Sequence, residues 1–220
     1  MVKLVIDGRE IEAQEGSNLL RTCLENDIYI PNLCWLGEME KPSASCRLCF
    51  VEVEGIPQPT TSCSMKVWDG MKVRTDTEWV RRLQRSAFRL LLSAHRIECR
   101  TCPSNKKCDL QKIARFLKTP LKPKRLESLA RKDQETEKHP FLEYVPDRCV
   151  LCGKCVFVCL SRHEVPMMAF ANRGFSTMIR FSHDPVSGSP PCDQCLACVE
   201  ICPVSAILVK ETFMIAASPT

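Results

Sequence analysis

Two cysteine runs in the last third of the chain constrain its fold more than any other feature. The first run is Cys149-x2-Cys152-x2-Cys155-x3-Cys159, and the second is Cys192-x2-Cys195-x2-Cys198-x3-Cys202. This spacing is typical of paired 4Fe-4S clusters, in which three cysteines of a run bind one cluster and the fourth reaches the other. The runs therefore predict one cluster on Cys149, Cys152, Cys155 and Cys202, and its neighbour on Cys192, Cys195, Cys198 and Cys159.

Structural zinc and disulfide bonds are the alternative uses of these cysteines. Zinc sites use two separated Cys-x2-Cys pairs around one tetrahedral ion, rather than runs of three plus one. Disulfides require an oxidising compartment, and the chain does not begin with the basic and apolar regions of a secretory signal. No apolar stretch approaches the roughly 20 residues of a membrane helix. We therefore expect a soluble, cytoplasmic protein whose small modules are held together by metal-binding cysteines.

The net charge of +5 comes partly from a basic stretch around Lys118 to Lys132. Pro120 and Pro123 interrupt this stretch, which favours a solvated linker, with a docking patch for an acidic partner as the alternative. The aromatic residues are few and are not interleaved with the basic ones, so nucleic-acid binding is not expected.

The N-terminal segment alternates strand and helix patterns. An Asp7-Gly8 turn between alternating apolar residues predicts a β-hairpin over residues 2–13. Ser17 is the expected N-cap of the following helix, which carries a buried face. That face consists of Leu20, Cys23 and Leu24. Strand patterns at residues 50–55 and 71–74 complete a β-grasp ferredoxin fold.

A second cysteine constellation lies within this segment, at Cys34-x11-Cys46-x2-Cys49-x13-Cys63. A close pair between two distant cysteines is the pattern of 2Fe-2S ferredoxins, although the gap before the pair is longer than in the plant type. Ser43, Ala44 and Ser45 are small enough to let backbone amides approach the cluster. Zinc is the alternative occupant of these four thiolates.

A third constellation follows a helix that we expect to start at a Thr75/Glu78 capping box and to continue through Arg96. Its expected apolar side consists of Trp79, Leu83, Ala87, Leu90, Leu91 and Ala94. The motif His95-x3-Cys99-x2-Cys102-x5-Cys108 supplies one imidazole and three thiolates, enough for a 4Fe-4S cluster, with three-Cys one-His zinc as the alternative. His139, His163 and His183 do not belong to a ligand motif and are expected to be ordinary polar residues.

The order of these constellations resembles the N-terminal iron-sulfur module of the complex I large iron-sulfur subunit. The same module occurs in the small diaphorase subunit of NAD-linked hydrogenases and in the N-terminal region of iron-only hydrogenases and formate dehydrogenases. The resemblance covers residues 1–210. Its specific marks are residues 31–34, 45–55, the His95 motif continuing to Gln111, residues 148–159 and residues 172–175. In that family the position equivalent to His95 binds a 4Fe-4S cluster.

The combined reading is an α+β chain with three cluster-binding modules. We expect a 2Fe-2S β-grasp domain at residues 1–76, a small helical His/Cys 4Fe-4S domain at 77–117, a basic linker at 118–140, a double 4Fe-4S ferredoxin domain at 141–212 and a tail at 213–220. No glycine-rich Rossmann or Walker signature is present, so the chain is expected to carry electrons without catalysing a reaction alone.

The resemblance also implies partners. These are a flavin- and NAD(P)-binding subunit and a second redox subunit of the hydrogenase, formate dehydrogenase or transhydrogenase type. The chain would relay electrons between them through one 2Fe-2S and three 4Fe-4S clusters. An independent multi-cluster shuttle and a zinc-stapled interaction scaffold are the alternatives.

Overall fold

The computed structural model describes residues 1–129, 139–163, 167–182 and 192–211. His183, part of the expected linker and the expected tail lie outside these residues. The chain divides into two compact units. The first unit comprises residues 1–91 and 112–124, and the second comprises residues 92–111 and 125–220. Helices α2 (Glu78–Ser93) and α3 (Asp109–Phe116) each cross a boundary between the units.

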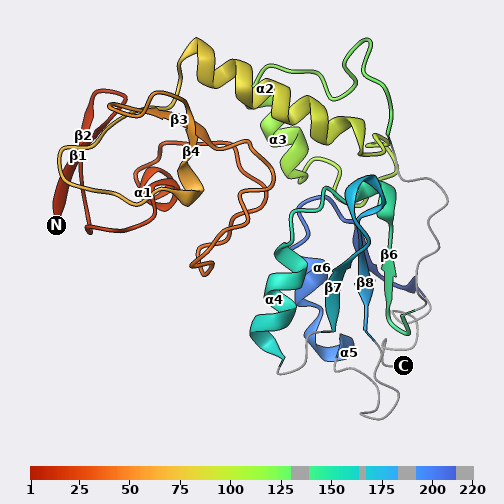
Figure 1. Cartoon of the computed structure of the whole chain (residues 1–220). Helices are drawn as coiled ribbons and strands as arrows, with labels where there is room; N and C mark the ends of the chain where they lie inside the picture. Colours follow the sequence, from red (N-terminus) through yellow and green to blue (C-terminus); the bar gives the residue numbers. More distant parts are fainter. Residues whose placement is uncertain (130–138, 164–166, 183–191, 212–220) are drawn as a thin grey trace. The chain divides into compact units, whose positions relative to one another are not determined.

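A five-stranded sheet forms the centre of the first unit (Figure 1). Its strands are β1 (Val2–Ile6), β2 (Arg9–Ala13), β3 (Phe50–Val53), β4 (Thr60–Thr61) and β5 (Lys72–Arg74). They lie in the order β2-β1-β5-β3-β4, with β1 parallel to β5 and the other pairs antiparallel. The expected hairpin is confirmed, because Asp7 and Gly8 take the positive φ values of 49° and 81° that a tight hairpin turn requires. This mixed architecture is consistent with a 2Fe-2S ferredoxin-like domain.

Helix α1 (Leu19–Glu25) starts one residue later than the sequence suggested. Asn18, not Ser17, is the N-cap, because its side-chain oxygen accepts a hydrogen bond from the Arg21 amide. The Ser17 hydroxyl instead shares a hydrogen bond with the Thr22 hydroxyl. Leu20 and Cys23 are fully buried as expected.

The core of the first unit packs α1 against the sheet. Leu4 and Ile6 of β1, Val51 of β3 and Val73 of β5 are buried in one cluster with the apolar face of α1. Burial of large aliphatic side chains contributes about 1.5–3 kcal/mol each. The sheet and α1 therefore form a stable platform for the loops that carry Cys34, Cys46, Cys49 and Cys63.

Helix α2 differs from the expectation at both ends. The Thr77 hydroxyl accepts a hydrogen bond from the Val80 amide, so Thr77 and not Thr75 caps the helix. The helix ends at Ser93, before Arg96. Its buried face consists of Val80, Gln84, Ala87, Phe88, Leu92 and Ser93. Two residues expected on the apolar side are exposed, Trp79 at 42% and Leu90 at 71%. The buried face is therefore rotated around the helix axis relative to the expected apolar side.

The second unit has small elements. Its strands are β6 (Leu142–Tyr144), β7 (Met168–Ala171), β8 (Met178–Phe181) and β9 (Ile207–Val209), paired as two two-stranded sheets, β6 with β9 and β7 with β8. Its α-helices are α4 (Lys154–Arg162), α5 (Cys192–Cys195) and α6 (Ala197–Glu200), and its 3-10 turns include η2 (Pro146–Arg148) and η3 (Gly174–Ser176). Helix α4 lies beside α6 and β7 (Figure 1).

His139 corrects a sequence expectation in this unit. Its side chain is 2% exposed and lies against the Phe181 ring at a centroid distance of 4.7 Å. Its Nδ1 accepts hydrogen bonds from the amides of Phe141 and Leu142. It is therefore a core histidine that fixes the start of β6, not an ordinary polar residue.

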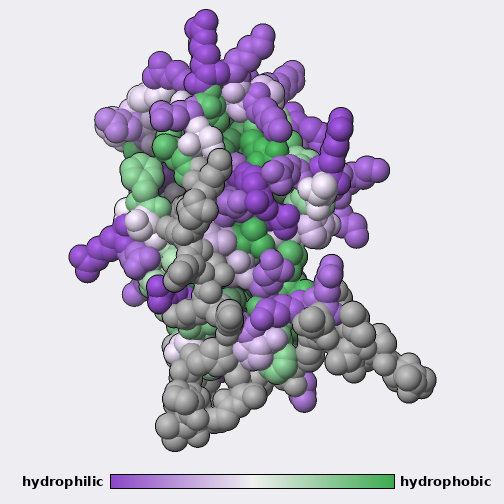
Figure 2. All heavy atoms as spheres, turned by 90° about the vertical axis from the view of Figure 1, so that its right-hand side faces the viewer, coloured by the Kyte–Doolittle hydropathy of each residue, from purple (hydrophilic) through white to green (hydrophobic). Residues whose placement is uncertain are grey.

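The surface in Figure 2 carries many projecting hydrophilic side chains with smaller hydrophobic areas between them, as is usual for protein surfaces. Within the described parts of the chain, no helix is both long and apolar enough to cross a membrane.

Candidate iron-sulfur sites

Four cysteines of the first unit converge in its interior. Cys34 follows the buried Leu33, Cys46 and Cys49 precede β3, and Cys63 lies in the 3-10 turn η1 (Ser62–Ser64). All four are buried. The Sγ atoms of Cys34 and Cys46 are 3.4 Å apart.

The thiols of this group perturb one another. The hydrogen bond that Cys34 shares with Cys46 lowers the pKa of Cys34 to about 5, with further lowering by Ser43 and Ser45, and the same bond raises the pKa of Cys46. Cys49 and Cys63 form a second such pair, in which the pKa of Cys49 is lowered and that of Cys63 is raised. Because charges on Cys34 and Cys49 affect Cys63, the four sulfurs form one electrostatic group. Four buried sulfurs in one group are a suitable donor set for a 2Fe-2S cluster.

Neighbouring residues hold these loops in shape. The Asn18 side chain donates a hydrogen bond of 2.6 Å to the Cys63 carbonyl, and the Ser62 hydroxyl donates one of 3.0 Å to the Cys49 carbonyl. Ala44 and Arg47, on either side of Cys46, have φ values of 48° and 52°. Non-glycine residues in the left-handed region are uncommon and cluster at functional sites.

His95 lies just after α2, and its ring is half-buried. Its Nδ1 is 2.8 Å from the carbonyl oxygen of Arg148. A carbonyl can only accept a hydrogen bond, so Nδ1 carries the proton and Nε2 of a neutral ring keeps its lone pair. Burial lowers the pKa of His95, which favours this neutral form.

The three cysteines after His95 occupy a loop before α3. Burial raises the pKa of the Cys108 thiol, and nearby Cys102 adds to that shift. The Cys102 amide donates a hydrogen bond to the Cys99 carbonyl at 3.3 Å. Among the described residues, the structure brings Cys102 and Cys108 together and shows no hydrogen bond from the His95 ring to any of the three cysteines.

The two cysteine runs of the second unit line two separate pockets, and each pocket takes its fourth cysteine from the other run. Cys149, Cys152 and Cys155 line the first pocket together with Cys202. Burial raises the pKa of Cys152 to about 12, and Cys149 and Cys202 are the nearby thiols that add to the shift. The remaining lining is mostly apolar, including Tyr144, Ile179 and Ile207.

The second pocket is lined by Cys192, Cys195 and Cys198 together with Cys159. Burial raises the pKa of Cys198 to about 12, and the other three thiols add to it. His163 also lines this pocket, which corrects the expectation that it stands apart from the cysteines. Met168 and Phe181 close the apolar side.

Backbone geometry around these pockets favours cluster binding. The amides of Leu151 and Ala206 donate hydrogen bonds to the sulfurs of Cys149 and Cys202, at 3.4 and 3.2 Å. Such N–H···S bonds tune iron-sulfur clusters. Leu151 and Leu196 adopt left-handed φ values of 51° and 44°. Gly153 also needs its φ of 77°, and a Cβ there would come within 3.4 Å of the Phe170 ring.

Within the described stretches, no three His, Cys, Asp or Glu side chains lie close enough together to hold a single metal ion. Bound iron would require the thiols of each group to lose their protons.

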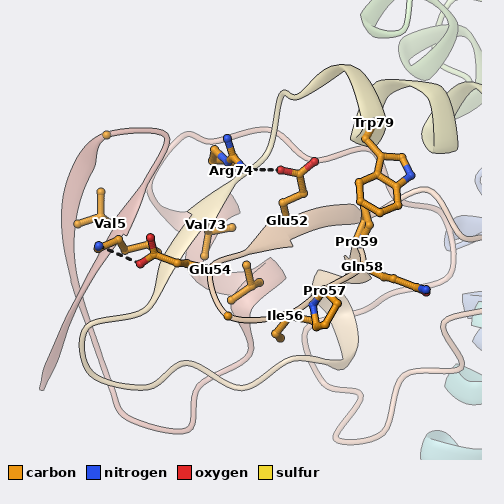
Figure 3. A pocket seen from close by; sticks show the side chains of 14 residues that line it. Val5, Glu52, Glu54, Ile56, Pro57, Gln58, Pro59, Val73, Arg74 and Trp79 are labelled. Carbon is orange, nitrogen blue, oxygen red and sulfur yellow. Dashed lines mark ion pairs between the residues drawn. The ribbon is translucent and has the colours of Figure 1, made fainter.

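A larger groove of about 740 Å³ lies away from every cysteine, between the loop at residues 55–59 and the sheet (Figure 3). Its charged walls are paired internally, Glu52 with Arg74 at 2.8 Å and Glu54 with Lys72 at 2.9 Å. Its lining includes neither His95 nor any of the cysteines, so the groove is separate from the candidate ligand groups.

Sequence reasoning missed the residues that support the ligands. Asn18, Arg96 and Asp147 contact ligand-bearing segments that are distant in the sequence. Asn18 carried a weak signal, since Asn is a preferred N-cap residue. Arg96 and Asp147 carried none, because their pairing depends on the tertiary fold.

Two family models match the chain. Residues 1–78 match the 2Fe-2S iron-sulfur cluster binding domain, and residues 84–119 match the NADH-ubiquinone oxidoreductase-G iron-sulfur binding region. The first match includes Cys34, Cys46, Cys49 and Cys63, and the second includes His95, Cys99, Cys102 and Cys108.

Curated relatives match over nearly the whole chain. The alpha subunit of an NADPH-Fe(3+) oxidoreductase from Geobacter sulfurreducens is 36% identical over 96% of this chain and 24% of its own length. The NADP-reducing hydrogenase subunit HndD of Solidesulfovibrio fructosivorans is 29% identical, over 96% of this chain and 36% of its own length. The NADH-ubiquinone oxidoreductase 75 kDa subunit of Reclinomonas americana is 30% identical, over 96% and 30%. The chain thus spans about a quarter to a third of the length of these relatives.

A chain from the crystal structure of an NAD+-reducing NiFe hydrogenase, in the H2-reduced state, has a similar fold. The TM-score is 0.83 at 26% sequence identity, and the match covers 99% of this chain and 90% of that one.

Proposed function

We propose that this chain relays electrons through one 2Fe-2S and three 4Fe-4S clusters. The proposal proceeds from its homology to the iron-sulfur subunits of NAD(P)-linked oxidoreductase complexes. The observation that carries the proposal is the grouping of its ligands. Fifteen of the sixteen cysteines belong to four ligand groups, completed by His95, and the remaining cysteine, Cys23, is buried in the core.

Each cluster has its own ligand set in this proposal. The 2Fe-2S cluster is held by Cys34, Cys46, Cys49 and Cys63. The first 4Fe-4S cluster is held by His95, Cys99, Cys102 and Cys108, with Nε2 as the imidazole donor. The other two are held by Cys149, Cys152, Cys155 and Cys202, and by Cys192, Cys195, Cys198 and Cys159. The shared pockets support the last two sets.

The proposed domains follow these ligand sets. Residues 1–76 form a β-grasp ferredoxin domain, supported by the strand order β2-β1-β5-β3-β4 with α1 packed on the sheet. Residues 77–117 form the helical His/Cys domain, residues 118–140 a basic linker, residues 141–212 the double 4Fe-4S domain and residues 213–220 a tail. The antiparallel pairing of β6 with β9 supports a ferredoxin-like fold for the double 4Fe-4S domain.

Iron-sulfur clusters supply reversible one-electron transfer, and the chain sets the conditions under which it occurs. The buried sulfurs of Cys34, Cys46, Cys49 and Cys63 keep water away from the 2Fe-2S cluster, which affects its potential. The amides of Leu151 and Ala206 stabilise negative charge on the sulfurs of Cys149 and Cys202. The neutral His95 ring in place of a fourth thiolate reduces the negative charge of its cluster and raises its potential.

The proposed partners are a flavin- and NAD(P)-binding subunit and a second redox subunit. The relatives' names support this assignment, since they are subunits of NADPH-, NADP- and NADH-linked oxidoreductases. The second subunit would be of the hydrogenase, formate dehydrogenase or transhydrogenase type. Location in the cytoplasm stays a prediction.

Metal content and spectra test the ligand assignment. Anaerobically purified protein should be brown, with 2 + 3 × 4, or about 14, irons per chain and matching acid-labile sulfide. Cys49→Ala should abolish the 2Fe-2S signal, whereas Cys23→Ala, at an equally buried cysteine outside the ligand sets, should leave the iron content unchanged. His95→Ala should perturb one 4Fe-4S spin signal and spare the 2Fe-2S signal. Colourless protein containing zinc would instead support the zinc-stapled scaffold.

Partner capture tests the role in a complex. Anaerobic affinity purification from the native host should recover a flavin-nucleotide subunit and a larger redox enzyme. Recovery of the chain alone in high yield would contradict a fixed complex and support an independent electron shuttle.

A further inference from the structure

Three contacts join the segment after α2 to the 3-10 turn η2. The Arg96 amide donates a hydrogen bond of 2.6 Å to the Asp147 carbonyl, and the Arg96 guanidinium forms a 2.9 Å ion pair with the Asp147 carboxylate. The third is the 2.8 Å bond between His95 Nδ1 and the Arg148 carbonyl. Residues 95–96 and 147–148 thus form a clamp with one backbone hydrogen bond, one side-chain-to-backbone hydrogen bond and one ion pair.

The clamp lies between ligands of two different clusters. His95 belongs to the proposed first 4Fe-4S ligand set, and Cys149, which directly follows Arg148, belongs to the next set. Fixing the Arg148 carbonyl therefore orients the His95 ring and, at the same time, the backbone entering Cys149.

Burying the Asp147 carboxylate costs more free energy than placing it in an exposed surface ion pair would. Its side chain is only 13% exposed, compared with 39% for Arg96. Within the described residues, no donor reaches its buried Oδ1 atom. A half-satisfied buried carboxylate is destabilising unless it is paired. Arg96 supplies that pairing, so both partners are needed to keep the turn in place.

We infer that Arg96 and Asp147 are positioning residues shared by two clusters, which set the orientation of His95 and the entry to Cys149 and thereby adjust both reduction potentials together. This inference rests on the proposed function. Because the two side chains of the clamp carry opposite charges, removing one or the other should shift the reduction potentials in opposite directions. Removing the negative charge of Asp147 favours the addition of an electron at both clusters, and removing the positive charge of Arg96 disfavours it.

The test compares Asp147→Asn, Arg96→Gln and Arg96→Lys in the complete, iron-loaded chain. Arg74→Gln is the matched control, because Arg74 forms a 2.8 Å ion pair with Glu52 in the first unit. Iron content, redox titration of each cluster's spin signal and nitrogen hyperfine coupling from His95 are measured for every variant.

The expected result is a positive shift of both potentials in Asp147→Asn and a negative shift of both in Arg96→Gln. Arg96→Lys keeps the charge and should leave both potentials close to those of the unsubstituted protein. Nitrogen coupling should change in Asp147→Asn and Arg96→Gln, and Arg74→Gln should change nothing at these clusters. If the substitutions only loosened the fold, the direction of the potential shifts would not depend on the sign of the removed charge.

Several outcomes would overturn the inference. These are shifts of the same sign in both charge-removing variants, a shift at only one cluster, or unchanged potentials with full iron content. If Asp147→Asn loses iron, the two Arg96 variants decide, since Arg96 is the more exposed partner. Unsubstituted protein without iron would refute the proposed function itself, which separates the two failures.

Discussion

Substitution of Asn18 should separate its two structural roles. The side chain caps α1 through the Arg21 amide and also donates to the Cys63 carbonyl, at 3.1 and 2.6 Å. Loss of an N-cap costs about 1 kcal/mol, and loss of one neutral hydrogen bond about 1 kcal/mol. Asn18→Ala removes both interactions, so it should lower the local opening free energy of α1 by about 2 kcal/mol. Asn18→Asp retains a cap acceptor but loses the donor to Cys63, and it should cost about 1 kcal/mol.

Hydrogen exchange measured by mass spectrometry on the iron-loaded chain gives these opening free energies directly, because α1 and the segment around Cys63 form separate peptides. Ser17→Ala is the control, since Ser17 was the cap expected from sequence, and it should cost only about 0.5 kcal/mol. Equal losses in Asn18→Ala and Asn18→Asp would refute the capping role. A larger loss in Ser17→Ala than in Asn18→Ala would restore Ser17 as the cap.

Two further predictions concern stability. Removal of iron by anaerobic chelation should abolish hydrogen-exchange protection in β6 to β9 before β1 and β5, because two-stranded sheets are marginal alone and need the clusters; earlier loss in β1 and β5 would contradict this. Phe88→Ala should lower the free energy of unfolding by about 3–5 kcal/mol, because Phe88 is fully buried in α2. Leu90→Ala, two residues away and mostly exposed, should change it by less than about 0.5 kcal/mol. Urea midpoints followed by circular dichroism compare the last two, and equal midpoints would show that the buried face is wrongly assigned.

Local sequence patterns predicted local structure well. The Asp7-Gly8 turn identified the first hairpin because few residues adopt the required positive φ values. Alternating apolar and polar residues identified β3 and β5, because successive side chains of a strand point to opposite faces. The N-caps of α1 and α2 were harder to predict, because Ser17 and Thr75 can cap a helix as well as Asn18 and Thr77 can. Only the path of the backbone selects between them.

Burial around α2 shows where sequence patterns fail. Trp79 and Leu90 are apolar and were assigned to the core, whereas Gln84 is buried and donates to the Phe50 carbonyl. Which face of an amphipathic helix is covered depends on the partner that packs against it. The surroundings of His139 and His163 likewise come from distant strands and loops, so the local sequence does not reveal them.

The sequence by itself indicated the four candidate ligand groups, because cluster ligation requires characteristic spacings between cysteines along the chain. Tertiary structure alone decided what surrounds those ligands: the parallel pairing of β1 with β5, the bond from Asn18 to Cys63, and the clamp between Arg96 and Asp147. These contacts join residues separated by 45 positions or more, and pairings over such distances leave no periodic signal in the sequence.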